Sequence, residues 1–459
     1  MKLALWQKIL YSGGSLGTAL SLVAFNTYIQ FYYVDKLGLG AEWFGIAWLI
    51  YGTWNAVNDP LAGFLSDNTK TRWGRRIPWI AGSFIPLGIA FYFLWMPPES
   101  LVAASGFSLF LYFIAVVLIF DTLWTFAVMN WTTLFPEMIS DEKERANVSG
   151  LRQAFTVLGL LVGGTFRILV GPDWSGIGTM ALFFGALTSL SIGLSLLGSK
   201  EQPHVQHEKQ PPLLPALRAT FRNLSFRWFL VPSLSKEFIV SILAAAIPFW
   251  TKYVLVLREP EVIFGATIDP GFQESLLLAS IFLLTLPGIP FWTWMAKRFG
   301  ARRGWQISQA TFALSILTIY VASDFFTALV GTSVVGLSFA GLLVYPDLLL
   351  ADVIDEDETI VGARREGMYF GINGFMIRFG VTLQGLTTSA VLLFSGYVSS
   401  PGAEVEQPAS AVFGIRAMIT LVPILASLVA IWGLQHYPLH SGKLDAVRVK
   451  SKKLRAALG

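Results

Sequence analysis

The segment Trp54-Asn55-Ala56-Val57-Asn58-Asp59-Pro60 places one carboxylate and two side-chain amides inside the mainly apolar stretch 43–66. A helix that crosses a bilayer needs about 20 mostly apolar residues. Ionisable groups inside such a helix are costly and usually mark the pathway of an ion or a substrate. The segment therefore predicts a membrane-spanning helix that carries a functional polar site.

The composition of the whole chain is typical of a membrane protein. Of its 459 residues, 54% are hydrophobic and only 14% are charged, whereas soluble domains carry about 25% charged residues. Eleven further stretches have the length and apolarity of a span. We therefore predict an all-α integral membrane protein with twelve transmembrane helices, at 9–34, 43–66, 77–96, 107–134, 149–171, 177–198, 229–256, 272–296, 304–323, 325–350, 370–397 and 409–436.

The scarcity of reactive side chains argues against an enzyme. Cysteine is absent, which excludes disulfides, thiol catalysis and thiolate metal sites. The four histidines, at 204, 207, 436 and 440, fall in polar connections or at the end of the last span. A membrane acyl- or glycosyltransferase would need a base near the bilayer face, and a channel would need a pore loop or a repeated polar stripe. We find neither pattern, and we expect no catalytic residue and no cofactor.

Lysine and arginine are distributed unevenly between the two sides of the predicted spans. Of the 33, 25 lie at the two ends of the chain or in connections that follow even-numbered spans, whereas the opposite connections hold only Lys36 and Arg258. The side rich in Lys and Arg is cytoplasmic. We therefore expect a multi-pass protein of the plasma membrane with both termini in the cytoplasm. Its partners would be the lipid bilayer and a small-molecule substrate, without nucleic acid, and we expect a monomer.

One long polar connection divides the spans into six and six. It predicts an N-terminal half (1–198), a cytoplasmic linker (199–228), a C-terminal half (229–436) and a cytoplasmic tail (437–459). The basic motif 72–76 after span 2 has a counterpart at 298–303 after span 8, its equivalent in the second half. Two repeated six-helix halves are typical of secondary transporters.

Three signatures in the expected connections carry a family resemblance. They run from Trp54 through Asp67 to Arg76, from Pro136 through Glu144 to Arg152, and from Asp352 through Arg365 to Arg378. Together they resemble the glycoside–pentoside–hexuronide:cation symporters, the melibiose-permease-like branch of the major facilitator superfamily, whose relatives include eukaryotic sodium-dependent lysophospholipid symporters. The resemblance implies the fold of that superfamily, with two pseudo-symmetric halves, and cation-coupled transport by alternating access.

The resemblance also implies a cation site at Asn55, Asn58, Asp59 and Thr125. Asn55 and Asp59 lie one helical turn apart and share a face. The family has carboxylates at both of these positions, whereas this chain has an amide at the first. The coupling ion is therefore either sodium, the one metal ion we expect, or a proton, since desolvation raises the pKa of a lone carboxylate. An uncoupled uniporter is the other alternative.

The substrate site departs from the sugar-binding members of the family. Thr18 and Ala19 lie where those members have an aspartate in span 1. Arg152 and Arg378 are the two arginines expected to face the cavity. They would bind a carboxylate, phosphate or sulfate of the substrate, or would instead neutralise Asp59 and Asp121. A glycoside, sugar or hexuronide is the first substrate class, and a lysolipid or other amphiphilic or anionic molecule is the alternative. The candidate substrate-binding residues are Asp121, Arg152, Arg378, Trp54, Trp131 and Glu237.

Two further expectations concern other charges in or near the spans. Adjacent residues on a helix project about 100° apart, so we expect Lys236 and Glu237 not to pair, and Glu237 to face the cavity. Arg167 and Lys252, near outer span ends, are expected to extend toward the membrane surface.

Charged residues at the cytoplasmic ends of the spans predict a gate. Such charges either pair in one conformation and separate in the other, or only set the topology. The candidate gate residues are Asp67, Arg72, Arg75, Arg76, Glu144, Arg145, Arg364 and Arg365.

Overall fold

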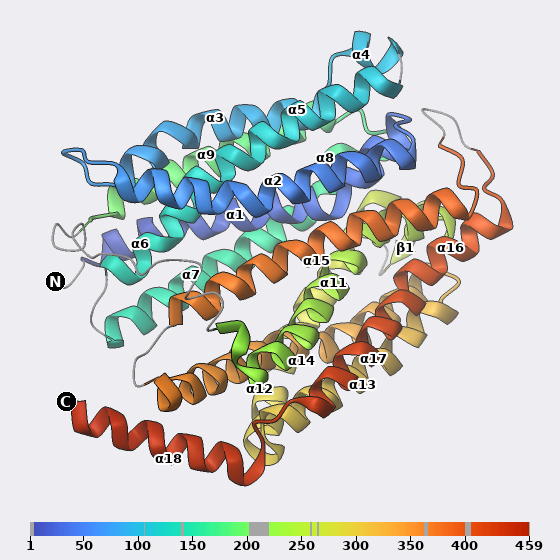
Figure 1. Ribbon diagram of the computed structural model, residues 1–459. Helices are drawn as coiled ribbons and strands as arrows, with labels where there is room; N and C mark the ends of the chain where they lie inside the picture. Colours follow the sequence, from blue (N-terminus) through green and yellow to red (C-terminus); the bar gives the residue numbers. More distant parts are fainter. Residues whose placement is uncertain are drawn as a thin grey trace. The chain divides into compact units, whose positions relative to one another are not determined.

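A computed structural model describes residues 4–104, 106–138, 142–201, 220–257, 259–263, 266–361, 366–399 and 405–458 (Figure 1). Helices make up nearly all of the regular structure in these ranges, together with one two-stranded antiparallel hairpin. The hairpin pairs β1 (Glu261–Ile263) with β2 (Ala266–Ile268).

The first half of the sequence forms long helices interrupted by two π-helical segments. η1 continues α1, and η2 lies between α5 and α6. The elements are α1 (Leu5–Phe31), η1 (Tyr32–Lys36), α2 (Ala41–Asn68), α3 (Ile77–Trp95), α4 (Glu99–Ala104), α5 (Gly106–Trp124), η2 (Thr125–Met129), α6 (Asn130–Met138), α7 (Glu142–Gly164), α8 (Phe166–Val170) and α9 (Ile177–Gly198).

The second half repeats the pattern of long helices and ends with an amphiphilic one. Its helices are α11 (Leu224–Tyr253), α12 (Pro270–Phe299), α13 (Ala301–Val321), α14 (Phe325–Val361), α15 (Glu366–Phe394), α16 (Ala409–Ile419), α17 (Leu421–His436) and α18 (Ser441–Leu458).

Helices lie over all twelve predicted spans. In the described part of the chain, nine helical segments are long and apolar enough to cross a membrane. The other three predicted spans coincide with α1, α2 and α13, which carry more polar side chains. The all-α membrane fold is therefore confirmed, while the number twelve stays a prediction. The nine segments are Ile77–Ala104, Gly106–Phe135, Asn147–Val170, Ile177–Gly198, Leu224–Tyr253, Pro270–Phe299, Phe325–Val361, Met368–Phe394 and Ala409–His436.

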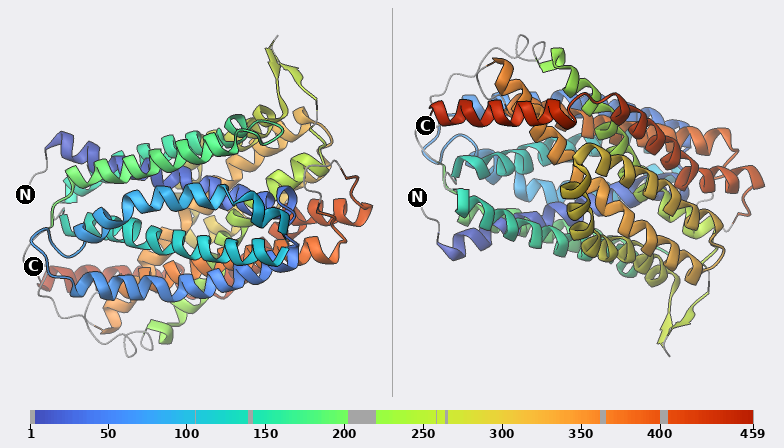
Figure 2. Two further views of the ribbon diagram at one scale, coloured as in Figure 1. Left: turned by 90° about the horizontal axis from the view of Figure 1, so that it is seen from above. Right: turned by 90° about the horizontal axis from the view of Figure 1, so that it is seen from below.

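The chain packs as two compact units. Unit 1 comprises residues 1–209, 258–275 and 392–407, and unit 2 comprises residues 210–257, 276–391 and 408–459. Within unit 1, α1 packs against α7 and α9, and α3 packs against α5 and α9 (Figure 2). Within unit 2, α13 packs against α14 and α17, and α11 packs against α16 and α17.

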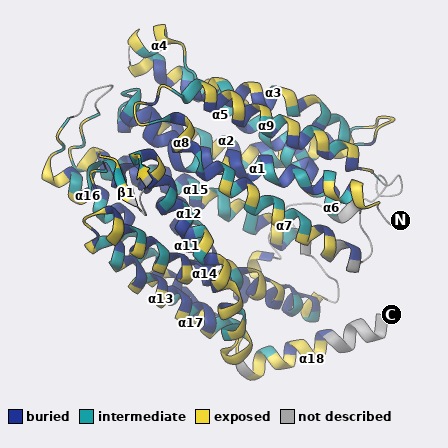
Figure 3. Ribbon diagram, turned by 180° about the vertical axis from the view of Figure 1, so that it is seen from behind, coloured by how far each residue is buried: buried dark blue, intermediate teal, exposed yellow. Residues whose placement is uncertain are grey.

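Small residues allow helices to approach closely inside unit 1. A Cβ on Gly185 of α9 would lie 2.7 Å from the carbonyl oxygen of Gly88 on α3. Membrane helices associate through such small-residue contacts, because lipid gives no hydrophobic drive toward association. Large apolar side chains such as Phe64, Leu182 and Leu314 are exposed, and exposed positions recur along the helices (Figure 3). Lipid is the solvent that accepts such a surface.

Helix α14 continues eleven residues beyond the predicted end of its span at residue 350, and the predicted tail contains a helix, α18. The extension is acidic and α18 is basic. Arg448 lies 2.9 Å from Asp352, and Lys443 lies 3.1 Å from Glu356. The pairing of these charges holds α18 along the end of α14.

Candidate functional site

Five polar side chains of α2, α5 and η2 meet in unit 1. The Asn55 amide donates to Asp121 Oδ1 (2.6 Å), and the Asn58 amide donates to Asp121 Oδ2 (3.1 Å) and to Thr125 Oγ1 (2.9 Å). The Thr125 hydroxyl donates to Asp59 Oδ1 (3.1 Å). We call these five residues the α2–α5 cluster. It links two carboxylates on different helices through one hydroxyl and two amides.

The local sequence explains how the α2–α5 cluster forms. Asn55, Asn58 and Asp59 follow a spacing of three and four, so they share one face of α2, and Asp121 and Thr125 share a face in the same way. Pro60 has no backbone N–H, so it cannot donate to the carbonyl of Ala56 one turn earlier. η2 begins at Thr125, and π-helical turns occur often at functional sites.

The α2–α5 cluster is shielded from solvent. Asn55, Asn58, Asp121 and Thr125 are buried, and Asp59 is half-buried. The side-chain oxygen of Asn55 is also buried and has no hydrogen-bond partner among the described residues. Two carboxylates beside an unsatisfied carbonyl oxygen form a set of oxygen ligands, the type that binds small cations in transporters.

Asp121 lies with the predicted cation-site residues, although the sequence suggested it for the substrate. This placement matters because the family carboxylate at position 55 is missing. Instead, the Asp121 carboxylate of α5 accepts a hydrogen bond from the Asn55 amide. The spacing of Asp121 and Thr125 by four residues was the signal in the sequence that they share a face. Nearby, the Trp54 indole donates to the Thr122 hydroxyl (3.1 Å).

A second group in unit 1 gathers two predicted substrate residues. The Arg152 guanidinium carbon lies 4.6 Å from the Trp131 ring centre and 4.9 Å from that of Phe135. The Tyr11 hydroxyl donates to the Trp131 carbonyl (2.8 Å). Arg152 Nε and Trp131 Nε1 are buried donors without a partner in the described residues. A buried guanidinium donor of this kind can bind an anionic oxygen.

The other two substrate candidates lie in unit 2, on α11 and α15. Lys236 and Glu237 form an ion pair, so the expectation that they do not pair is wrong. Their Cβ atoms diverge, but both side chains are long enough to turn toward each other. A Cβ on Gly380 would lie 3.0 Å from Glu237 Cβ. α15 thus passes close to Glu237 two residues beyond Arg378.

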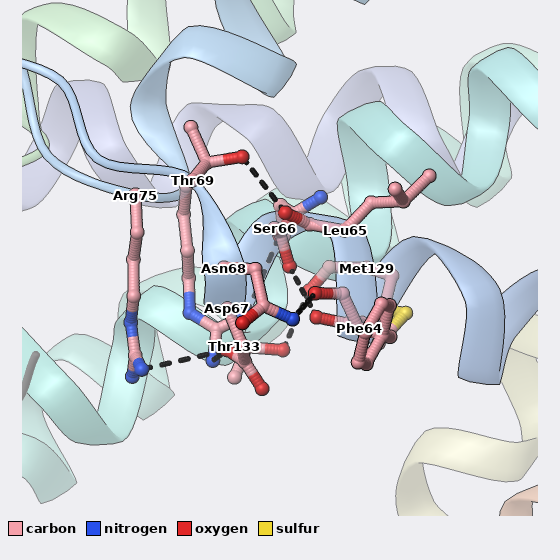
Figure 4. A network of polar contacts seen from close by, with 12 residues as sticks. Phe64, Leu65, Ser66, Asp67, Asn68, Thr69, Arg75, Met129 and Thr133 are labelled. Atoms are coloured by element: carbon pink, nitrogen blue, oxygen red, sulfur yellow. Dashed lines mark hydrogen bonds and ion pairs between the residues drawn. The ribbon is translucent and has the colours of Figure 1, made fainter.

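Three predicted gate residues form ion pairs at the end of α2. Asp67 lies 3.4 Å from Arg75 and 3.2 Å from Arg76, and Figure 4 shows Arg75 pointing toward Asp67. Arg76 is buried and also donates to Asn130 Oδ1 (3.3 Å). Arg72 lies over the ring of Trp73 at 5.4 Å.

A carboxylate outside the predicted gate joins this arrangement. Glu201 accepts the backbone N–H groups of Arg75 (2.7 Å), Arg76 (2.6 Å) and Ile77 (2.8 Å) at the start of α3. Gly74 has φ +111°, a left-handed conformation that favours glycine. No sequence pattern marks Glu201, because its partners are backbone groups.

The remaining gate candidates are only partly described. Glu144 is buried and lies 2.9 Å from Lys8. The side chain of Arg145, and the whole of Arg364 and Arg365, lie outside the described residues.

Arg167 does not extend to the membrane surface as expected. It is buried, it lies 3.4 Å from Glu274, and it donates to the Gly171 carbonyl (2.6 Å). A buried guanidinium needs such partners, because an unpaired charge away from water is costly. The expectation failed because Glu274 is more than 100 positions away in the sequence.

Curated relatives cover almost the whole chain. An isoprimeverose transporter of Lactiplantibacillus pentosus is 24% identical over 97% of this chain and 90% of its own length. The sodium-dependent lysophosphatidylcholine symporter 1 of Mus musculus is 25% identical over 100% of this chain and 89% of its own length.

A solved structure supports the fold of the chain, and a family match supports its family. The nucleoside transporter NupG has a TM-score of 0.64 at 14% identity, covering 95% of this chain and 99% of NupG, a likeness that concerns the fold. Residues 10–441 match the family described as MFS/sugar transport protein. The chain is therefore a multi-pass membrane transporter with the major facilitator superfamily fold, and it belongs to the glycoside–pentoside–hexuronide:cation symporter family.

Proposed function

We propose that the chain is a cation-coupled symporter that works by alternating access in the plasma membrane, with both termini in the cytoplasm. The α2–α5 cluster carries this proposal, because it joins Asp59 and Asp121 through Thr125 and Asn58 in a buried site. Carboxylates in a membrane protein are expensive to bury, and a function in ion binding accounts for their retention.

Sodium is the coupling ion that this site favours. A proton needs one carboxylate oxygen, whereas a metal cation needs several oxygen ligands. The buried and unpartnered Asn55 Oδ1 supplies such an additional ligand beside Asp121. The sodium dependence named for the mouse relative supports the same choice. A proton remains the alternative outcome of the test.

A glycoside or hexuronide is the substrate class we propose first. Isoprimeverose transport by a bacterial relative supports a glycoside. The unpartnered donors of Arg152 and Trp131 favour a member of that class with an anionic group, as in a hexuronide. The Trp131 ring is buried and lies under the Arg152 guanidinium, so it supports Arg152 through a cation–π contact.

A lysolipid is the second candidate. The mouse lysophosphatidylcholine symporter aligns with the whole of this chain, and a phosphate would satisfy the same donors of Arg152 and Trp131. The two candidates differ in whether the substrate carries a long acyl chain, so a transport panel separates them.

The test is uptake by proteoliposomes that contain the full chain. Labelled glycosides, hexuronides and lysolipids are supplied under an imposed sodium gradient or an imposed proton gradient. The variants Asp59→Asn and Asp121→Asn are run in parallel. Asp173→Asn is the matched control, because it also removes one carboxylate but lies exposed between α8 and α9. Hydrogen bonds from Ser175 hold the pKa of Asp173 below its ordinary value, so the control residue is ionised at neutral pH.

We expect the sodium gradient to drive accumulation of the substrate. This accumulation should be lost in Asp59→Asn and Asp121→Asn and kept in the control, Asp173→Asn. Accumulation driven by the proton gradient alone would show that the coupling ion is a proton and not sodium. Equilibration that ignores both gradients and both cluster variants would contradict coupling and identify a uniporter.

A further inference from the structure

We propose that Asn130 is the positioning residue that connects the α2–α5 cluster to the charge pair at the cytoplasmic end of α2, an inference that rests on the proposed cation site. Asn130 is the first residue of α6, directly after η2, and its side chain is fully buried. Its two functional groups are used in opposite directions. The amide donates to the Phe126 carbonyl within η2 (2.9 Å), and Oδ1 accepts from Arg76 (3.3 Å).

The contacts of Asn130 close a ring between two helices. On one side, Thr125 at the start of η2 donates to Asp59 of α2. On the other side, Asn130 after the end of η2 holds Arg76, which pairs with Asp67 of α2. Asp59 and Asp67 are eight residues apart, about 12 Å along the helix axis. The ring therefore spans two turns of α2, with η2 forming its opposite side.

η2 is the least regular part of this ring. The backbone N–H of Asn130 bonds to the Ala127 carbonyl, so the side-chain amide adds a bond to the preceding carbonyl of Phe126. A π-helical turn holds one more residue than an α-turn, and such turns are frequent at functional sites. A cation that draws Asp59, Asp121 and Thr125 together acts on one end of η2. Asn130 transfers the resulting shift to Arg76 at the other end.

The absence of cysteine allows this connection to be measured without knowing the substrate. Ser66 lies beside Asp67, is fully buried, and donates to the Gly63 carbonyl (3.0 Å). Ser66→Cys adds the only thiol of the chain at nearly the same size. Its rate of alkylation by a water-soluble maleimide reports opening at the end of α2. The full-length Ser66→Cys protein is titrated with sodium chloride against choline chloride, and thermal stabilisation by sodium is recorded in the same samples.

In the Ser66→Cys parent, sodium should raise the unfolding temperature and slow alkylation about fivefold, within the usual range of coupling between two sites. Adding Asn130→Ala should keep the thermal stabilisation and abolish the effect on alkylation. Asn130→Asp keeps an oxygen that accepts from Arg76 but loses the amide that donates to the Phe126 carbonyl, so it should also abolish the effect on alkylation. Asn130→Ser replaces the alanine variant if that protein does not fold.

Thr133→Val is the matched control. Thr133 also lies on α6 and also donates to a carbonyl four residues earlier, that of Met129 (2.8 Å), so its loss should leave the sodium effect intact. A normal sodium effect in Asn130→Ala, or its loss in Thr133→Val, would overturn the role of Asn130. No stabilisation by sodium in the parent would show instead that the proposed sodium site is wrong, and the inference would fall with it.

Discussion

Asp121 supplies a carboxylate beside Asn55, the position at which the family resemblance implies one. The resemblance implies two carboxylates on span 2, whereas here the second carboxylate is on α5 and an amide of α2 donates to it at 2.6 Å. The α2–α5 cluster therefore still holds two carboxylates, the buried Asp121 and the half-buried Asp59. For a cation, the charge near the ligands matters more than the helix that supplies it.

Moving the carboxylate from position 121 to position 55 tests whether Asp121 contributes to sodium binding. Asp121→Asn should weaken sodium binding about tenfold or more, equivalent to about 1.4 kcal/mol, because one of two negative charges is lost. The double variant Asn55→Asp with Asp121→Asn should recover part of that affinity, since it returns the charge to α2. Sodium-dependent thermal stabilisation gives both affinities. Equal affinities for the wild type and Asp121→Asn would contradict a role of Asp121 in the site.

The start of α3 is held by Glu201, which follows the sixth predicted span. The first N–H groups of a helix have no partners within the helix, and Glu201 accepts those of Arg76, the N-cap, and Ile77, the first helical residue, as well as that of Arg75 just before them. A carboxylate also interacts favourably with the positive end of the helix dipole. The connection after α2 is therefore held by a residue more than 120 positions later in the chain.

Replacing Glu201 should loosen this helix start. Glu201→Gln keeps the size but removes the charge, and we expect a loss of about 1 kcal/mol in the free energy of unfolding, typical of a lost helix cap. Thermal unfolding in detergent measures it. Glu406→Gln, which removes an exposed carboxylate, should leave the unfolding temperature unchanged. If both variants unfold alike, Glu201 does not stabilise α3.

Across the whole chain, the unequal distribution of Lys and Arg predicts the orientation in the membrane. The prediction uses 25 of the 33 basic residues, and it places Asp173 outside the cell and Lys450 inside it. Both residues are exposed in the structure, so neither is hidden from a labelling reagent by the protein.

Single cysteines at these two positions test the orientation, because the natural chain has none. In intact cells, a maleimide that does not cross membranes should label Asp173→Cys and not Lys450→Cys. Both variants should be labelled after the cells are permeabilised. The reverse pattern in intact cells would place the termini outside.

The sequence alone was enough for the long apolar helices, the membrane class and the family. Hydropathy over about 20 residues is a local property, and the bilayer imposes it on every span. The motif 54–60 and the charged connections also identify the family without any contact between helices. Hydropathy could not predict α18, because a basic helix has no long apolar stretch.

The partners of each polar side chain were decided only by the tertiary structure. Asp121 meets Asn55, Arg167 meets Glu274 and Glu201 meets the start of α3, each across more than 60 positions of sequence. Such meetings depend on the rotation and register of each helix. η2 adds a residue to its turn and so changes the register of α6 relative to α5. A regular helical spacing read from the sequence does not include that shift.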